Sequence, residues 1–214
     1  MTVRIALISA TPAAIAPAET GLAEEFSEAL AWNILDDRLL ADAADGLTPP
    51  LADRMRRLIA YAIDGGADGV LLTCSLYGPV VDSVASAVPV FAPDSAAFQR
   101  ALDGGYRRIA VLASFETAMT DSLARFRAYV AGSGIEAVGV VAPDAFEAAK
   151  KNDLDTLFTA LRDACDDSYD AVLLAQYSLA PAAERLSAAL ARPVISGPHA
   201  AAVALKAAIG GDPA

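Results

Sequence analysis

Short, uninterrupted apolar segments recur along the chain, at residues 5–8, 70–72 and 88–91. Because these segments lack polar alternation, they predict strands that are covered on both faces, as in parallel sheets. Between them lie longer segments with helical periodicity. Residues 51–64 place apolar side chains at spacings of three and four, and Gly65 follows as a stop signal. This alternation of strands and helices predicts an α/β fold with right-handed crossovers.

An internal repeat is the most informative feature of the sequence. The segment D-G-V-L-L-T-C-S-L-Y-G-P begins at Asp68, and D-A-V-L-L-A-Q-Y-S-L-A-P begins at Asp170, 170 − 68 = 102 residues later. Two further pairs match in the same order, an apolar strand (R-I-A-L-I and R-I-A-V-L) and a proline-led strand (P-V-F and P-V-I). The three pairs begin at residues 4 and 108, 68 and 170, and 89 and 193.

The repeat predicts two flavodoxin-like lobes with parallel sheets, related by a pseudo-two-fold axis. The N-terminal lobe is expected to comprise residues 1–95 with 196–214, and the C-terminal lobe residues 96–195. In open α/β sheets, ligands bind at the carboxyl ends of the strands. The active site is therefore expected in a cleft between the two lobes.

Composition narrows the range of partners. Asp and Glu outnumber Lys and Arg by 27 to 16, which gives a net charge of −11. An acidic surface repels phosphate backbones and anionic lipids, so neither nucleic acid nor membrane is expected as a partner. No apolar stretch approaches the roughly 18 residues of a membrane span, and no signal peptide is evident. We expect a cytoplasmic protein; association into homo-oligomers stays open.

Cysteine and histidine usage argues against a metal site. The chain has two cysteines, Cys74 and Cys165, and one histidine, His199. These are too few for a disulfide framework or a typical zinc site. No glycine-rich phosphate loop is present, so no nucleotide site is indicated. We therefore expect neither a metal nor a cofactor.

Cys74 is the strongest candidate for chemistry. It follows a predicted strand at residues 69–73 and precedes a helix expected near Pro79. The N–H groups of a helix N-terminus would stabilise a thiolate and lower the pKa of the thiol. A thiolate so placed can remove a proton, return one, or attack a carbon. The alternative is a buried structural cysteine, which is the favoured interpretation for Cys165 within a predicted helix at residues 153–165.

The segment G-A-D-G-V-L-L-T-C-S, the following P-V-F and the closing P-V-I-S-G-P-H-A-A-A-V resemble the aspartate/glutamate racemase superfamily. This superfamily includes hydantoin racemases, maleate isomerases and arylmalonate decarboxylases. The resemblance covers nearly the whole chain. It implies two pseudo-symmetric cysteines that end equivalent strands and face a substrate. Cys74 matches the first, but the second position falls on Gln176.

This departure constrains the expected reaction. A glutamine amide has no protonation equilibrium near neutral pH, so Gln176 can orient a carboxylate or enolate but cannot act as a second base. The resemblance therefore implies a cofactor-independent enzyme that acts at the α-carbon of a small carboxylate. We expect Cys74 to protonate one face, as in a decarboxylase.

Two alternatives stay open. One is a racemase or cis–trans isomerase in which Tyr77, Tyr177 or His199 replaces the missing cysteine. The other is a non-catalytic protein that binds small carboxylates.

Other strand ends supply candidate substrate contacts. Hydroxyl and backbone N–H groups at strand-to-helix turns can hold a carboxylate, although serine and threonine also cap helices there. Beside Cys74 as the catalytic residue, the predicted substrate-binding residues are Thr11, Pro12, Ser75, Tyr77, Ser114, Thr117, Gln176 and Tyr177.

Overall fold

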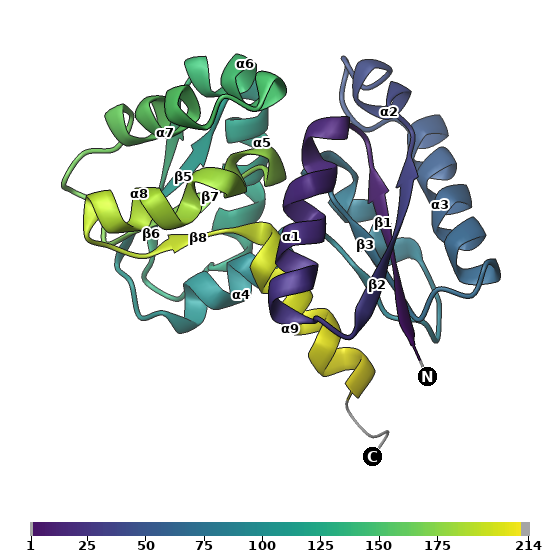
Figure 1. Ribbon diagram of the computed structural model, residues 1–214. Helices are drawn as coiled ribbons and strands as arrows, with labels where there is room; N and C mark the ends of the chain where they lie inside the picture. The colour runs from purple at the N-terminus through teal and green to yellow at the C-terminus, as the bar shows by residue number, and fades with distance from the viewer. Residues whose placement is uncertain (1, 211–214) are drawn as a thin grey trace. The chain divides into compact units, whose positions relative to one another are not determined.

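The computed structural model describes residues 2–210, which divide into two compact units. Unit 1 comprises residues 2–95 together with residues 198–210, and unit 2 comprises Ala96–Gly197. Each unit contains a four-stranded parallel sheet with helices on its faces (Figure 1).

Unit 1 has the strand order β2-β1-β3-β4, and all its strand pairs are parallel. Its strands and helices are β1 (Val3–Ser9), η1 (Pro12–Ala14), α1 (Ile15–Glu25), β2 (Ala29–Leu35), α2 (Arg38–Ala41), α3 (Pro49–Asp64), β3 (Gly69–Leu72), η2 (Ser75–Ser83), β4 (Val90–Phe91) and most of α9 (Gly197–Gly210). The η elements are 3-10 helices.

The sheet of unit 1 is covered on both faces. One face packs against α3 through buried apolar side chains of the two central strands and the helix: Ala6, Ile8, Val70, Leu72, Met55, Ile59 and Ala62. On the other face, α9 packs closely at Gly69. A Cβ at this glycine would lie 3.0 Å from Ile209 Cδ1 and 3.1 Å from Leu205 Cδ2. The central strands are therefore buried on both sides, which explains their uninterrupted apolar sequences.

Unit 2 repeats this plan with the order β6-β5-β7-β8, again wholly parallel. Its elements are α4 (Ser95–Asp103), β5 (Arg108–Ala113), α5 (Glu116–Tyr129), β6 (Glu136–Val141), α6 (Asp144–Lys151), α7 (Leu154–Asp163), β7 (Ala171–Leu174), η3 (Tyr177–Ala182), α8 (Ala183–Leu190) and β8 (Val194–Ile195). One face of its sheet packs against α6, α7 and α8.

The repeat extends to the hydrogen bonds at matching turns. Ile5 is paired with Gly69 in unit 1, and Ile109 with Ala171 in unit 2. The carboxylates that open the repeated segments accept hydrogen bonds from backbone N–H groups, Asp68 from Arg4 at 2.8 Å and Asp170 from Arg108 at 2.9 Å. The predicted pair of parallel α/β sheets with the same topology is confirmed.

Each unit is completed by a helix that follows the last strand of the other unit. Helix α4 comes after β4 of unit 1, yet all but its first residue belongs to unit 2. Helix α9 comes after β8 of unit 2, and from Pro198 onward it belongs to unit 1. None of the helices in residues 2–210 is long and apolar enough to cross a bilayer.

Candidate functional site

Cys74 lies two residues beyond the end of β3, in extended conformation with φ −119° and ψ 117°. The following helix is not the one expected near Pro79. It begins at Ser75, is a 3-10 helix, and contains Pro79 in its interior. Proline has no N–H to donate and clashes with the preceding turn of an α-helix, so this segment does not form a regular α-helix. The thiol thus lies at the carboxyl edge of the sheet, directly before a tight turn.

A buried polar pair supports the strand end that carries Cys74. The Thr73 hydroxyl donates to Ser9 Oγ at 2.9 Å, and both residues are buried. The Thr73 N–H donates to the Ile8 carbonyl at 3.0 Å. These bonds tie the end of β3 to the end of β1, which fixes the backbone from which the thiol projects. This pair is not among the residues predicted from the sequence, although two polar residues at the ends of adjacent strands are a usable signal.

Tyr77 anchors the turn after Cys74 from inside the core. Its side chain is fully buried, and its hydroxyl donates to the Leu39 carbonyl at 2.7 Å. Burial raises the pKa of Tyr77 to about 12. Its backbone N–H donates to the Cys74 carbonyl at 3.1 Å. The phenol therefore stabilises the turn through its hydrogen bond, and it is poorly suited to proton transfer near neutral pH.

Salt bridges connect α3 to the segment around α2, which contains Leu39, the residue whose carbonyl accepts the Tyr77 hydrogen bond. Arg54 on α3 contacts Asp36 with Nε and Nη2, each at 2.6 Å, and Asp42 with Nη1 at 2.9 Å. Asp36 follows β2 directly. Its bidentate contact with Arg54 fixes the loop that leads into α2.

Replacing Tyr77 by phenylalanine is expected to lower the free energy of unfolding by about 1–2 kcal/mol at pH 7, because the buried Leu39 carbonyl loses its donor. An ordinary tyrosine has a pKa of 10.0, and that of folded Tyr77 is raised to about 12. Between pH 10 and 12 the native state therefore keeps the phenol proton that the unfolded state releases. The stabilisation by Tyr77, which is fully present below pH 10, decreases by about 1.4 kcal/mol per pH unit as the pH rises toward 12. Urea unfolding of both proteins from pH 7 to 12 should show the difference shrinking; parallel curves would contradict the assignment.

The matching strand end of unit 2 carries a different pair of side chains. Gln176 Oε1 accepts hydrogen bonds from Ser114 N at 2.8 Å and from Ser114 Oγ at 2.9 Å. Ser114 is buried directly after β5, and Gln176 is half-buried two residues beyond β7. Both donors of Ser114 are thus used by Gln176, and the N-cap residue of α5 is Phe115 rather than Ser114.

Strand register shows that these positions are equivalent in the two units. Ile8 pairs with Leu72 and Leu112 pairs with Leu174. Two residues farther along, unit 1 has Ala10 and Cys74 whereas unit 2 has Ser114 and Gln176. The hydroxyl therefore accompanies the amide and is missing where the chain has the thiol. The internal repeat pairs Cys74 with Gln176 in sequence, but the residues beside them at the end of the adjacent strand, Ala10 and Ser114, follow only from the strand register.

The remaining candidates lie at the same strand ends or just beyond them. Thr11 is half-buried and extended before η1, and its side chain makes no capping hydrogen bond; Pro12 is exposed as the first residue of η1. Ser75, half-buried, begins η2, and Tyr177, buried, begins η3. Thr117 is exposed on the first turn of α5.

His199 is on the first turn of α9 and its Nε2 lies 2.8 Å from Glu24 Oε2 on α1. The carboxylate therefore occupies one ring nitrogen of the single histidine. This contact joins the two helices on one face of the unit 1 sheet.

Cys165 lies just beyond α7, which ends at Asp163, so the predicted helix at 153–165 is too long. It packs against the core of unit 2, and burial raises the pKa of its thiol to about 11. At pH 8 this thiol should react with iodoacetamide about 100-fold more slowly than an ordinary cysteine, because the thiolate is the nucleophile. Peptide mass spectrometry of the folded protein should find the first adduct on Cys74. Equal labelling of both cysteines would contradict this.

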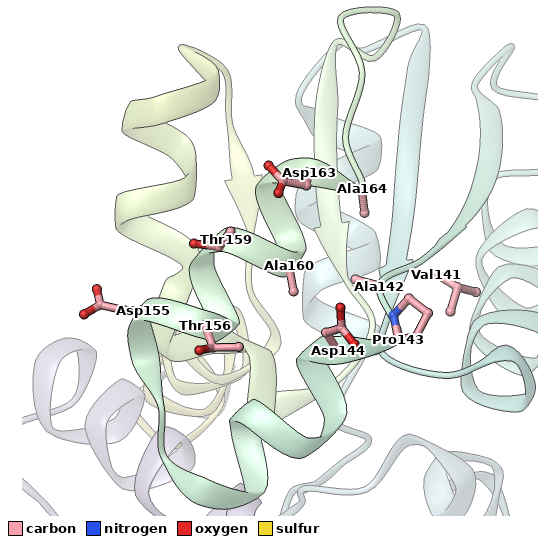
Figure 2. A pocket seen from close by; sticks show the side chains of 10 residues that line it. All are labelled: Val141, Ala142, Pro143, Asp144, Asp155, Thr156, Thr159, Ala160, Asp163 and Ala164. Carbon is pink, nitrogen blue, oxygen red and sulfur yellow. The ribbon is translucent and has the colours of Figure 1, made fainter.

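A pocket of about 510 Å³ opens in unit 2 between the start of α6 and the side of α7 (Figure 2). Three aspartates line it, Asp144, Asp155 and Asp163. Asp155 is paired with Arg185 at 2.6 Å and Asp163 with Arg162 at 2.6 Å. An acidic lining disfavours a carboxylate ligand. The pocket contains none of the residues predicted from the sequence, and we assign it no role in binding. Within residues 2–210, no cluster of three or more His, Cys, Asp or Glu side chains could hold a metal ion.

A parallel α/β unit that occurs twice, with polar side chains at the carboxyl ends of its central strands, defines a duplicated α/β protein. The carboxyl ends of the strands are the edge at which open α/β sheets usually bind ligands. The sequence model for the Asp/Glu/hydantoin racemase family matches residues 37–205, and the chain belongs to this family. Among proteins of curated function, no sequence matches the chain.

Solved structures of racemases share the fold. The chain is similar to Picrophilus torridus aspartate racemase, with 14% identity, a TM-score of 0.79, and coverage of 97% of this chain and 94% of that one. It is also similar to allantoin racemase from Klebsiella pneumoniae, with 16% identity, a TM-score of 0.73, and coverage of 97% of this chain and 88% of that one. Glutamate racemase from Thermus thermophilus, in complex with β-chloro-D-alanine, shares 13% identity with a TM-score of 0.73, and the alignment covers 98% of this chain and 81% of that one. At such identities the likeness concerns the fold alone.

Proposed function

We propose that this racemase-family enzyme acts without a cofactor at the α-carbon of a small carboxylate, with Cys74 transferring the proton on one face. The observation that carries the proposal is the difference between two equivalent strand ends. One presents a thiol, and the other presents an amide whose oxygen accepts both donors of a buried serine. A thiol exchanges protons, whereas an amide offers hydrogen bonds without exchanging protons.

In the proposed step, the Cys74 thiolate removes the α-proton. The electron pair of the C–H bond stays on the substrate and delocalises into its carboxyl group as an enediolate. The Gln176 amide donates hydrogen bonds to a carboxyl oxygen, where negative charge increases. The thiol exchanges its proton with solvent and then returns a proton to the carbon from the same face, so the step regenerates the thiolate.

The surroundings of other candidate bases favour one-sided transfer. The Tyr77 phenol is directed to the Leu39 carbonyl, and its pKa is raised to about 12 by burial. His199 is engaged by Glu24. Neither group is therefore expected to protonate the opposite face of the carbanion, and the Gln176 amide has no proton to deliver. For an α-hydrogen substrate the result is exchange with retention. For a substituted malonate, loss of CO2 creates the same carbanion, the Cys74 thiol protonates one face, and water returns a proton to the resulting thiolate.

The test is incubation in D2O with a panel of chiral amino acids, hydantoins, aryl- and alkylmalonates and maleate. Deuterium content, CO2 release, optical rotation and cis–trans conversion are followed together. Deuterium uptake without loss of rotation, or CO2 release with deuterium on one face, supports the proposal. Loss of rotation would show a second proton carrier and contradict it. Binding without exchange, CO2 release or conversion for the entire panel would favour the non-catalytic binding protein.

A further inference from the structure

The hydrogen bonds of Ser114 determine which end of the Gln176 amide is presented to a ligand. A backbone N–H can only donate, so the Gln176 atom 2.8 Å from Ser114 N must be the carbonyl oxygen Oε1. The Ser114 hydroxyl then donates to the same oxygen at 2.9 Å. The bond from the backbone N–H excludes the flipped amide, in which the NH2 group would face that N–H.

The NH2 end of Gln176 is left for a ligand. Within residues 2–210, both hydrogen bonds of the Gln176 side chain are made by Oε1. Gln176 Nε2 donates no hydrogen bond in this part of the chain, and it is not among the buried side-chain polar atoms that lack a hydrogen-bond partner, so it is accessible to solvent. Two donors on the carbonyl oxygen polarise the amide, which strengthens the N–H groups as donors.

From this geometry we propose that Ser114 and Gln176 form a specificity-determining pair. Ser114 is a positioning residue, and the Gln176 NH2 group recognises an oxygen acceptor such as a carboxylate. A ligand ammonium or amide N–H at the same place would point its donor at the NH2 donor of Gln176. No hydrogen bond could form, so such a ligand would bind weakly. The inference deepens the proposed function and rests on it for taking a carboxylate as the natural ligand.

The internal repeat supports the pairing. In unit 1 the position equivalent to Ser114 is Ala10, and the position equivalent to Gln176 is Cys74. A buried hydroxyl is therefore present in unit 2, where the amide of Gln176 has two different ends and must be oriented. It is missing in unit 1, where the thiol of Cys74 has a single polar atom and needs no such orientation.

The decisive variant is Gln176→Glu. A glutamate has the same shape and can accept both Ser114 donors, but its second oxygen is an acceptor where the amide has NH2. We expect binding of succinate to weaken at least about tenfold relative to the unchanged protein. We expect 1,4-diaminobutane, which has the same chain length, to bind more weakly than succinate to the unchanged protein. This order should reverse in the variant.

The positioning role is tested with Ser114→Ala, which removes one of the two bonds to Oε1. Succinate affinity should fall by about threefold to tenfold. The matched control is Ser122→Ala, which removes another buried hydroxyl from unit 2, one that accepts from Arg125 at 3.2 Å; it should leave the affinity unchanged. Ser114→Thr keeps the hydroxyl and should restore binding to within about twofold, including where the alanine variant folds poorly.

Succinate binding is followed by 15N NMR of the side-chain NH2 pair that disappears in Gln176→Glu. In the unchanged protein this pair should shift as succinate is added. Lack of any shift at saturating succinate, or unchanged affinity in Gln176→Glu, would overturn the inference. The measurement needs no turnover. Gln176-dependent binding without deuterium exchange in the substrate panel would keep this inference and remove only the proposed function.

Discussion

Replacing Cys74 by alanine is expected to abolish α-proton exchange on every substrate that the protein turns over. General acid–base catalysis by a positioned side chain contributes about 10²–10⁴-fold to a rate, and at the equivalent strand end Gln176 cannot take its place. The loss should appear in the rate of deuterium uptake, or of CO2 release for a malonate, and should be as large at saturating substrate as below saturation. Succinate binding should change far less, because the proposed carboxylate contact belongs to Gln176.

A serine variant separates proton transfer from packing at this position. Cys74 is half-buried and packs against the core of unit 1, so alanine also removes apolar contacts. Serine keeps the size of the side chain but replaces the thiol by a far less acidic hydroxyl. We expect Cys74→Ser to be as inactive as Cys74→Ala while unfolding at a similar urea concentration. A serine variant that retains exchange would show that Cys74 only packs.

The sequence predicts the fold well because the burial of each strand determines its pattern of apolar residues. Strands covered on both faces appear as uninterrupted apolar segments, and the duplicated segments indicate that the strands of both sheets have the same order. Helix ends are less predictable. Helix α5 begins at Glu116, because Phe115 is extended and the polar residues after it, including Thr117, lie in the first turn. A first-turn glutamate also suits the positive end of the helix dipole.

The site is only partly predictable, since its contacts join residues that are far apart in the chain. Strand-end position identifies Cys74 and Gln176, and the repeat pairs them. It does not reveal that Ser114 donates twice to Gln176, because that contact depends on the neighbouring positions of β5 and β7. Strand-end position also does not distinguish the buried Tyr77 from exposed candidates such as Pro12 and Thr117. The hydrogen bond from Tyr77 to Leu39 depends on how α2 packs.

Installing a cysteine at position 176 is expected to convert the proposed one-sided exchange into racemisation. A thiol there would supply the second proton carrier that the amide cannot provide. A substrate that the unchanged protein deuterates with retention should lose optical activity in Gln176→Cys, with deuterium entering both enantiomers. We expect the rate of racemisation to rise at least about tenfold over a background set by solution chemistry.

The single variant has a structural defect that the repeat shows how to remove. Cysteine is a weak acceptor, so Gln176→Cys leaves the buried N–H and hydroxyl of Ser114 without a strong partner, at a cost of about 1–3 kcal/mol in the free energy of unfolding. The double variant Ser114→Ala/Gln176→Cys reproduces the Ala10 and Cys74 arrangement of unit 1. It should regain part of that stability in urea unfolding and racemise at least as fast as the single variant. A double variant that folds, exchanges deuterium and preserves rotation would show that the missing second cysteine is not what limits the enzyme to one face.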